Sequence, residues 1–246
     1  MGFANWESFL EKHIEGFFTK KFSSELEPAE VIRQLERELA RRRKKSRGGA
    51  RVPNSYVLRM GAKDYQCLCA RRFLDELYIA AEKLVIRENC FMDGQLHITL
   101  EKDEKLSQGI CEASSCYEEE PAPEADKAEP HTIVLDRSEF APPLNLPAQH
   151  KTASLTVVEG DDLDSYLEIG ERQVYIGRRE SNEFILTDTN ASRLHAYISY
   201  ERHRHVLHDA ESLNGTWVQG RKITDYCLCS GDEFRIGNTI LLYEVI

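Results

Sequence analysis

The sequence predicts two folded domains of different class, an N-terminal α+β domain and a C-terminal all-β sandwich, joined by a disordered acidic linker. Three observations predict this division. Residues 1–105 place apolar side chains first at helical and then at strand spacing, residues 106–150 are rich in acidic residues and proline, and residues 151–246 contain many short strand-forming runs separated by turn residues. A chain of 246 residues is long enough for two such cores.

Two helices are expected at the start of the N-terminal domain. Residues 6–17 place apolar side chains at three- and four-residue steps, which is typical of one apolar helix face. A second helix is predicted to begin at Pro28, because proline suits the first helical position and Glu30 complements the positive end of the helix. It is expected to continue into the basic residues 41–45 and to end near Gly48.

A strand, a helix and a strand are expected to follow, which makes the order of the domain α-α-β-α-β. Residues 56–60 alternate in polarity after a Pro-Asn pair, as in a half-buried strand. Residues 64–88 show helical spacing, and residues 96–100 alternate again after an Asp-Gly turn. The sequence also allows a third strand near Ile110.

Residues 41–51 contain seven basic residues and no acidic one. One interpretation is the C-terminus of a helix, where cations oppose the negative end of the dipole, followed by a solvated loop. The other is a docking patch for an acidic protein, an anionic membrane surface or RNA. Because no aromatic residue interrupts the run, nucleic acid is the less favoured ligand.

Residues 101–150 hold twelve acidic residues, four basic residues and six of the eight prolines. Such a composition buries too little apolar surface to order the chain, so a flexible tether is expected. It would allow both domains to bind one assembly at the same time. Thr132 and Ser138 are candidate kinase targets, and residues 133–135 are a candidate docking segment.

The C-terminal domain is predicted to be a β-sandwich, because its strands are short and turn residues separate them. The histidines at positions 203, 205 and 208 fit a hairpin better than a metal site, and no metal is expected. The predicted strands span residues 155–159, 166–169, 174–176, 184–186, 195–200 and 205–208.

Three short motifs within this domain combine residue types that bind a phosphate and the peptide that carries it. In Gly177-Arg178, the glycine tolerates a tight turn and the arginine can aim a planar charged group at a phosphate. Ser192, in the run 192–195, adds a hydroxyl donor. In Asn214-Gly215-Thr216, the asparagine amide can hold the main chain of an extended peptide.

At these motifs the sequence resembles the forkhead-associated (FHA) domain, a phosphothreonine-binding β-sandwich, over about residues 153–246. The resemblance implies that Arg178, Ser192, Arg193 and Asn214 bind the phosphopeptide. It implies that Gly177, His195, Gly215 and Thr216 shape and brace the loops. Further agreement is found at Asn182, Leu186, Ala196, Gly231-Asp232 and Ile236-Gly237.

One position departs from the pattern of the family. Leu213 stands immediately before Asn214, where some FHA domains carry a hydroxyl that reaches the phosphate. A modest affinity is therefore expected. The family resemblance also implies that phosphothreonine is preferred to phosphoserine, because the FHA pocket reads the threonine methyl group.

The N-terminal half resembles the N-terminal domain of bacterial FhaA-type proteins over residues 1 to about 105. This resemblance implies a signalling adaptor that works beside Ser/Thr protein kinases and is linked to cell-envelope growth and division. The expected partners are phosphothreonine-containing proteins, such as the kinases or their substrates, and a protein ligand of the N-terminal domain. The resembling motifs are Phe17-Phe18, residues 26–31, Val52-Pro53-Asn54 and Asp64-Tyr65.

Composition and the absence of motifs exclude several other classes. A net charge of −10 argues against a protein that coats nucleic acid. No P-loop, G-x-S-x-G, H-E-x-x-H or kinase motif is present, so neither an enzyme nor a cofactor is expected. No apolar run reaches the roughly 20 residues of a membrane span, so a cytoplasmic protein that partners recruit to the membrane is expected. The seven cysteines are expected to be reduced and mostly buried.

Overall fold

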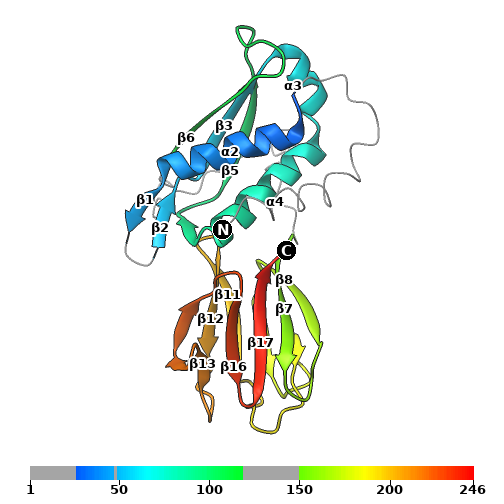
Figure 1. Cartoon of the computed structure of the whole chain (residues 1–246), viewed down its shortest axis with the longest axis vertical. Coiled ribbons are helices and arrows are strands. Elements are labelled where there is room, and N and C mark those ends of the chain that lie inside the picture. The colour runs from blue at the N-terminus through cyan, green and yellow to red at the C-terminus, as the bar shows by residue number, and fades with distance from the viewer. Residues whose placement is uncertain (1–25, 47–48, 119–149) are drawn as a thin grey trace, which may run out of the picture. The chain divides into compact units, whose positions relative to one another are not determined.

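The computed structural model describes residues 26–46, 49–118 and 150–246. The predicted first helix, over residues 6–17, and most of the predicted linker lie outside the described residues. The described residues form two compact units (Figure 1). The first unit holds residues 26–43, 52–81 and 95–117, and the second holds residues 44–46, 49–51, 82–94, 118 and 150–246.

The predicted second helix is present as α2 (Pro28–Arg42). Pro28 opens it, Glu30 lies in its first turn and two arginines lie in its last turn, as the helix dipole favours. The predicted extension into residues 43–45 is wrong. Arg43 adopts an extended conformation, with φ −57° and ψ 127°, and the chain continues as the short strand β1 (Lys44–Ser46).

The first unit contains a three-stranded sheet in the order β5-β3-β6. β3 (Ser55–Met60) is central, β5 (His97–Lys102) pairs with it in parallel and β6 (Cys111–Cys116) pairs with it in antiparallel register. The predicted strands at residues 56–60 and 96–100 are confirmed, and the third strand is β6. The apolar face of α2 packs on β3 and β6 (Figure 1).

The predicted helix over residues 64–88 is two helices, α3 (Ala62–Leu68) and α4 (Arg71–Arg87). α3 ends at Cys69, whose N–H bonds the Tyr65 carbonyl oxygen. A second small sheet, in the order β1-β2-β4, contains β2 (Gly49–Val52) and β4 (Cys90–Met92). Its strands have three or four residues, which is too short for alternation to reveal them in the sequence.

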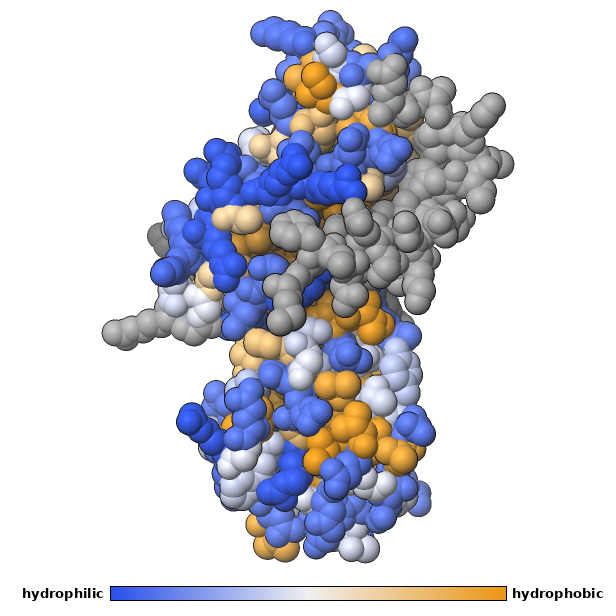
Figure 2. All heavy atoms as spheres, in the orientation of Figure 1, coloured by the Kyte–Doolittle hydropathy of each residue, from blue (hydrophilic) through white to orange (hydrophobic). Residues whose placement is uncertain are grey.

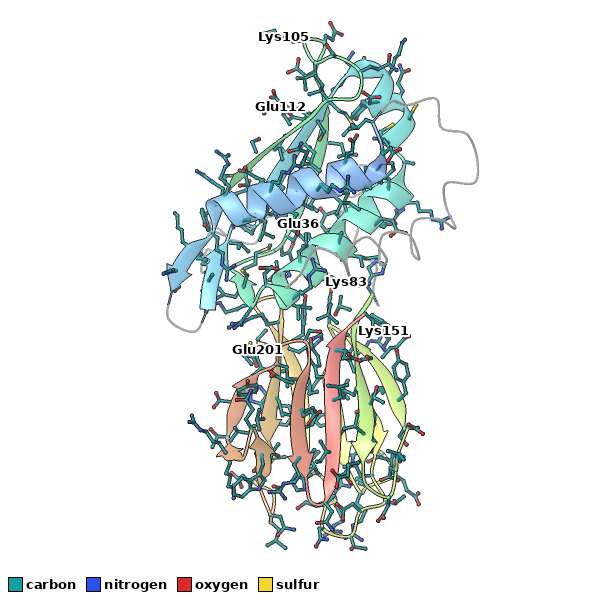
Figure 3. All side chains as sticks on the ribbon, viewed as in Figure 1. Glu36, Lys83, Lys105, Glu112, Lys151 and Glu201 are labelled. Atoms are coloured by element: carbon teal, nitrogen blue, oxygen red, sulfur yellow. The ribbon has the colours of Figure 1, made fainter. Side chains whose placement is uncertain are left out.

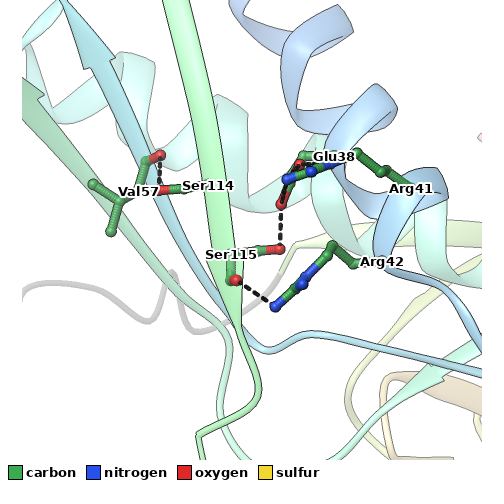
Figure 4. A network of polar contacts seen from close by, with 6 residues as sticks. All are labelled: Glu38, Arg41, Arg42, Val57, Ser114 and Ser115. Atoms are coloured by element: carbon green, nitrogen blue, oxygen red, sulfur yellow. Dashed lines mark hydrogen bonds and ion pairs between the residues drawn. The ribbon is translucent and has the colours of Figure 1, made fainter.

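A nearly buried carboxylate joins the end of α2 to β6 (Figure 4). Glu38 is 4% exposed and accepts hydrogen bonds from Arg41 Nε at 2.7 Å and from Ser115 Oγ at 2.8 Å. Burial raises the pKa of Glu38, but the hydrogen bonds from Arg41 and Ser115 outweigh it and the pKa is lowered. Arg42 Nη2 donates to the Ser115 main-chain oxygen at 3.4 Å. Two arginines of the basic run therefore bind within the first unit.

The first unit presents many hydrophilic residues on the face seen in Figure 2. In the view of Figure 2, hydrophilic residues dominate the surface where α2 lies. Figure 3 shows Lys105 in the loop between β5 and β6, and Glu36 on α2. None of the described helices combines the length and the apolar character that a membrane span requires.

Residues 150–246 form the predicted all-β sandwich. One sheet has the order β10-β9-β11-β12-β15, and the other has the order β14-β13-β16-β17-β7-β8. The strands are β7 (Lys151–Glu159), β8 (Tyr166–Gly170), β9 (Val174–Gly177), β10 (Phe184–Ile185), β11 (Ala196–Glu201), β12 (Arg204–Asp209), β13 (Thr216–Val218), β14 (Arg221–Ile223), β15 (Asp225–Cys227), β16 (Asp232–Ile236) and β17 (Thr239–Val245).

All six predicted strand positions are occupied, and the three neighbouring histidines lie in or beside the β11–β12 hairpin as expected. Alternate residues of both sheets fill the core, as a sandwich requires. The fully buried apolar side chains include Leu155, Ile169, Ile176, Leu207, Ile236 and Leu241.

A histidine buried between the sheets joins them by hydrogen bonds. His205 of β12 is 1% exposed, and its Nε2 lies 3.0 Å from the Gly170 carbonyl oxygen of β8. Because a carbonyl oxygen can only accept, Nε2 carries the proton. Nδ1 then accepts from the Tyr243 hydroxyl of β17 at 2.7 Å. Burial lowers the pKa of His205, so the ring is neutral, and both of its nitrogens are bonded across the sandwich.

The expectation that most cysteines are buried is wrong. All seven are free thiols in the described residues, but only Cys90 and Cys111 are buried. Cys69 and Cys116 are exposed. The sequence placed apolar neighbours around several cysteines, but a short helix end and an edge strand expose their side chains.

The buried His205 makes a testable prediction about acid stability. Burial lowers its pKa from 6.5 to about 4, although the hydrogen bond to Gly170 opposes this shift. Between these values the unfolded chain binds a proton that the folded chain does not, so the free energy of unfolding should fall as the pH is lowered. We expect His205 to account for a loss of about 2 kcal/mol between pH 7 and pH 5.

Urea denaturation of the full chain at pH 7 and pH 5 measures this difference. His205→Gln should be less stable at pH 7 but should lose less stability on acidification than the unaltered chain. His97→Gln, a matched change at an exposed position, should keep the full pH dependence. An equal pH dependence in all three proteins would contradict the assignment.

Candidate functional site

The predicted site residues lie in three loops of the sandwich that hydrogen bonds hold together. The loop after β9 carries Arg178, the loop before β11 carries Ser192 and Arg193, and the loop before β13 carries Asn214. Arg178 N–H donates to the Ser192 carbonyl oxygen at 3.0 Å, and Arg179 N–H donates to that of Arg193 at 2.9 Å. The first two loops therefore run side by side.

Gly177 allows this close approach. Its φ is +150°, a conformation that side chains disfavour. A Cβ atom at this position would lie 2.7 Å from the Ser192 carbonyl oxygen and 2.8 Å from that of Arg193. Both contacts are with main-chain atoms that cannot move aside, so only glycine fits between β9 and the loop of Ser192.

His195 connects the second loop to the third. It is fully buried, its Nδ1 lies 2.9 Å from the Ser192 main-chain nitrogen and its Nε2 lies 3.3 Å from the Gly215 carbonyl oxygen. Since the Ser192 N–H can only donate, Nδ1 accepts and Nε2–H donates to Gly215. Burial lowers the pKa of His195, although the bond to Gly215 opposes this shift, which favours the neutral ring that the two bonds require.

The hydroxyl group of Ser192 makes a second connection to the third loop. Its Oγ accepts the Leu213 N–H at 3.1 Å. Because a hydroxyl group both donates and accepts, its own proton stays available to a ligand. Leu213 is 88% exposed, and its side chain adds no hydroxyl to the site.

Asp209 holds the third loop by hydrogen bonds. Its carboxylate accepts hydrogen bonds from Ser212 Oγ at 2.6 Å, Ser212 N–H at 3.1 Å and Thr216 Oγ1 at 2.7 Å. Burial raises the pKa of Asp209, but the hydrogen bonds from Ser212 and Thr216 outweigh it and the pKa is lowered. Gly215 has φ +77°, which closes the turn after Asn214. The predicted scaffold residues Gly215 and Thr216 thus lie in a turn that Asp209 organises.

Asn214 is exposed at the tip of this loop. Its side-chain Nδ2 donates to the Asn190 main-chain oxygen at 2.8 Å. The main-chain oxygen of Asn214 accepts from Trp217 Nε1 at 3.1 Å. The hydrogen bond of the side-chain amide therefore orients Asn214 toward the second loop. The Oδ1 atom and the second amide proton remain able to bind a ligand.

The arginines of the site present uncompensated charge. Arg178, Arg179 and Arg193 are exposed, and none of them forms an ion pair within the described part of the chain. The main chain of Arg193 is held by the Asn182 amide, which donates to its carbonyl oxygen at 2.9 Å. Exposed guanidinium groups on a main chain held in this way suit a phosphate, which accepts several charge-assisted hydrogen bonds.

Two carboxylates that hold the loops were not identified from the sequence. Asp188 accepts the Asn190 N–H at 2.8 Å and the Asn238 N–H at 2.5 Å, and Asp209 is described above. An Asp two residues before an Asn, and an Asp three residues before a Ser, are local turn patterns that could have indicated them. Among the described residues, no group of three or more His, Cys, Asp or Glu side chains is placed to hold a metal ion.

Comparisons with known proteins found similarities in both domains. Residues 3–114 match the family model for the FhaA N-terminal domain, and residues 174–237 match the model for the FHA domain. The glycogen accumulation regulator GarA of Mycobacterium tuberculosis is 28% identical over 133 residues, which cover 48% of this chain and 82% of GarA. The FHA domain-containing protein FhaB of the same species is 32% identical over 94 residues, covering 38% of this chain and 61% of FhaB.

Solved structures include the FhaA FHA domain complexed with the intracellular domain of Rv3910. The two sequences are 28% identical in the matched region, which covers 38% of this chain and 100% of the FhaA domain, with a TM-score of 0.35. The two family models together account for both halves of the chain. The chain is therefore composed of an FhaA N-terminal domain over residues 3–114 and an FHA domain over residues 174–237, the combination that the sequence motifs predicted.

Proposed function

We propose that this chain is a phosphothreonine-dependent protein-binding adaptor in bacterial Ser/Thr kinase signalling. The main support is the set of three loops that hydrogen bonds through Ser192 and His195 hold together, with exposed guanidinium groups and no ion pair to neutralise them within the described residues. Such a set can replace the water around a phosphate dianion with fixed donors. The known binding of phosphothreonine by FHA domains supports the same conclusion.

Each site residue has a distinct role in this proposal. Arg178 and Arg193 supply charge to the phosphate, and the Ser192 hydroxyl donates a hydrogen bond to it. Asn214 holds the main chain of the bound peptide in an extended form. Gly177, His195, Gly215 and Thr216 shape the loops and do not touch the ligand. Leu213 supplies no further donor, so the affinity for a single phosphopeptide is modest.

The FhaA N-terminal domain extends the proposal to an assembly. In this proposal it binds a protein partner, and the FHA domain binds the phosphorylated component of the same complex, such as a Ser/Thr kinase or its substrate. Partners at the membrane would recruit the chain there. The processes served are cell-envelope growth and division. Because β6 (Cys111–Cys116) pairs with β3, the first domain continues past the predicted limit at residue 105 to about residue 117, and the FHA domain spans residues 151–246.

A second candidate function is binding of RNA or an anionic membrane by residues 41–51 of the N-terminal domain, with the FHA domain as the regulator of this binding. β1 is exposed along its whole length, which favours it. However, Arg41 and Arg42 bind Glu38 and Ser115, and Arg51 pairs with Asp93 at 2.9 Å, so part of the basic run already serves the fold. Binding to RNA or to vesicles of anionic lipid that weakens steeply with salt would favour this function over the adaptor.

Replacing Arg178 tests the adaptor directly. The full chain should bind phosphothreonine peptides and ignore their dephosphorylated forms. Arg178→Ala should weaken binding by about 2 to 5 kcal/mol, because the phosphate would lose its charged donor. Arg172→Ala is the matched control, since Arg172 is an exposed arginine in the turn before β9, at the other end of the strand from Arg178. Calorimetry that shows equal affinities for both variants would refute the site.

A second experiment separates ligand contacts from bracing residues. Ser192→Ala and Asn214→Ala should weaken phosphopeptide binding with little change in the melting temperature. His195→Ala should also lower the free energy of unfolding by roughly 2 to 4 kcal/mol, because it leaves a cavity and two unpaired main-chain groups. Thermal scans beside binding curves distinguish the roles. A His195→Ala protein of unchanged stability that loses only binding would show that His195 belongs to the ligand site.

A further inference from the structure

A cation outside the predicted motifs lies next to the third loop of the site. A Cβ atom placed on Gly215 would lie 2.3 Å from Lys222 Cε and 2.8 Å from Lys222 Nζ. The side chain of Lys222 therefore runs along Gly215, the residue that follows Asn214. The ammonium group therefore lies beside the residue that follows Asn214. In the proposed function, Asn214 holds the main chain of the peptide.

The pairing of β13 and β14 explains how Lys222 comes to this place. Lys222 is opposite Trp217, and the neighbouring residues of β13, Thr216 and Val218, are buried. Because side chains alternate along a strand, Trp217 and Lys222 face away from the core. The lysine then extends diagonally to Gly215, where the missing side chain leaves room for its methylene groups.

The charge of Lys222 is not used within the domain. Its side chain is exposed and forms no ion pair or hydrogen bond in the part of the chain that the structure describes. Arg178 and Arg193 belong to the first two loops, and the Ser192 hydroxyl accepts the Leu213 N–H of the third loop. The site therefore has arginines on its first two loops and a lysine beside Gly215 of the third, and a single phosphate bound by the arginines leaves the ammonium group without an anion.

We propose that Lys222 is a specificity-determining residue that favours ligands with a second anionic group, a carboxylate or a second phosphate, close in sequence to the phosphothreonine. This inference rests on the proposed function, since it assumes a phosphopeptide held by Arg178 and Asn214. The ligand class is then an acidic or doubly phosphorylated peptide. The contact between Lys222 and this second anionic group would add a donor to the site, where Leu213 supplies none.

Lys222→Met is the most direct test, because methionine keeps an unbranched chain beside Gly215 and removes only the charge. Arg221→Met is the matched control, since Arg221 is an exposed cation on the same strand, next to Lys222 but opposite Val218. The probes are synthetic phosphothreonine peptides with neutral flanks, with glutamate at one flanking position at a time, and with phosphoserine at those positions. Full-length protein is titrated with each peptide by calorimetry.

The unaltered chain should bind the best glutamate peptide roughly 3-fold more tightly than the neutral peptide, as for an exposed ion pair, and this preference should shrink in high salt. Lys222→Met should abolish the preference, and Arg221→Met should keep it. Lys222→Glu should reverse it, whereas Arg221→Glu should not. A larger gain with phosphoserine than with glutamate would identify a second phosphate as the favoured group, and the opposite order would identify a carboxylate.

Three results would overturn the inference while leaving the proposed function intact. They are phosphothreonine binding with no preference for acidic flanks, a preference that survives Lys222→Met, and a preference that both methionine variants lose equally. A failure of every phosphothreonine peptide to bind the unaltered chain would instead refute the proposed function, and this inference with it.

Discussion

The candidate site depends on one buried ring. His195 accepts the Ser192 N–H and donates to the Gly215 carbonyl oxygen, so it holds two loops at a set separation. Both bonds need a neutral imidazole with its proton on Nε2, and burial favours that form by lowering the pKa. The main-chain bonds from Arg178 and Arg179 then fix the first loop against the second. With the backbone fixed in this way, exposed side chains can bind without reorganising the loops.

The carboxylates and the arginines around these loops have different roles. Asp188 and Asp209 are engaged by main-chain N–H and hydroxyl donors, which lower their pKa values despite burial, so they stay ionised and hold the turns. The exposed arginines have no such engagement within the described residues. Although the chain has a net charge of −10, the loops of the site thereby carry arginines whose charge no ion pair within the described residues neutralises.

In the first unit, hydrogen bonds and an ion pair of charged side chains stabilise the fold. Glu38 lies almost buried between α2 and β6, and it is stabilised because Arg41 and Ser115 both donate to it (Figure 4). Removing one partner of such a group would leave a buried charge without compensation. The basic run therefore has two parts. Its helical residues and Arg51 bind carboxylates or main-chain oxygens of the fold, and β1 exposes the cations that lie between them.

Local and periodic features were determined by the sequence alone: the second helix, the strands β3 and β5, the six sandwich strands from β7 to β12, and the three motifs of the site. These follow from spacing, turn residues and short motifs, which act within a few residues. Only the tertiary structure decided the features that depend on strand register or on partners distant in the chain. His205 meets Tyr243 and Gly170, Glu38 meets Ser115, and Lys222 reaches Gly215 across a strand pair. Strand register and packing bring these groups together, and neither leaves a signal in the composition or periodicity of either segment alone.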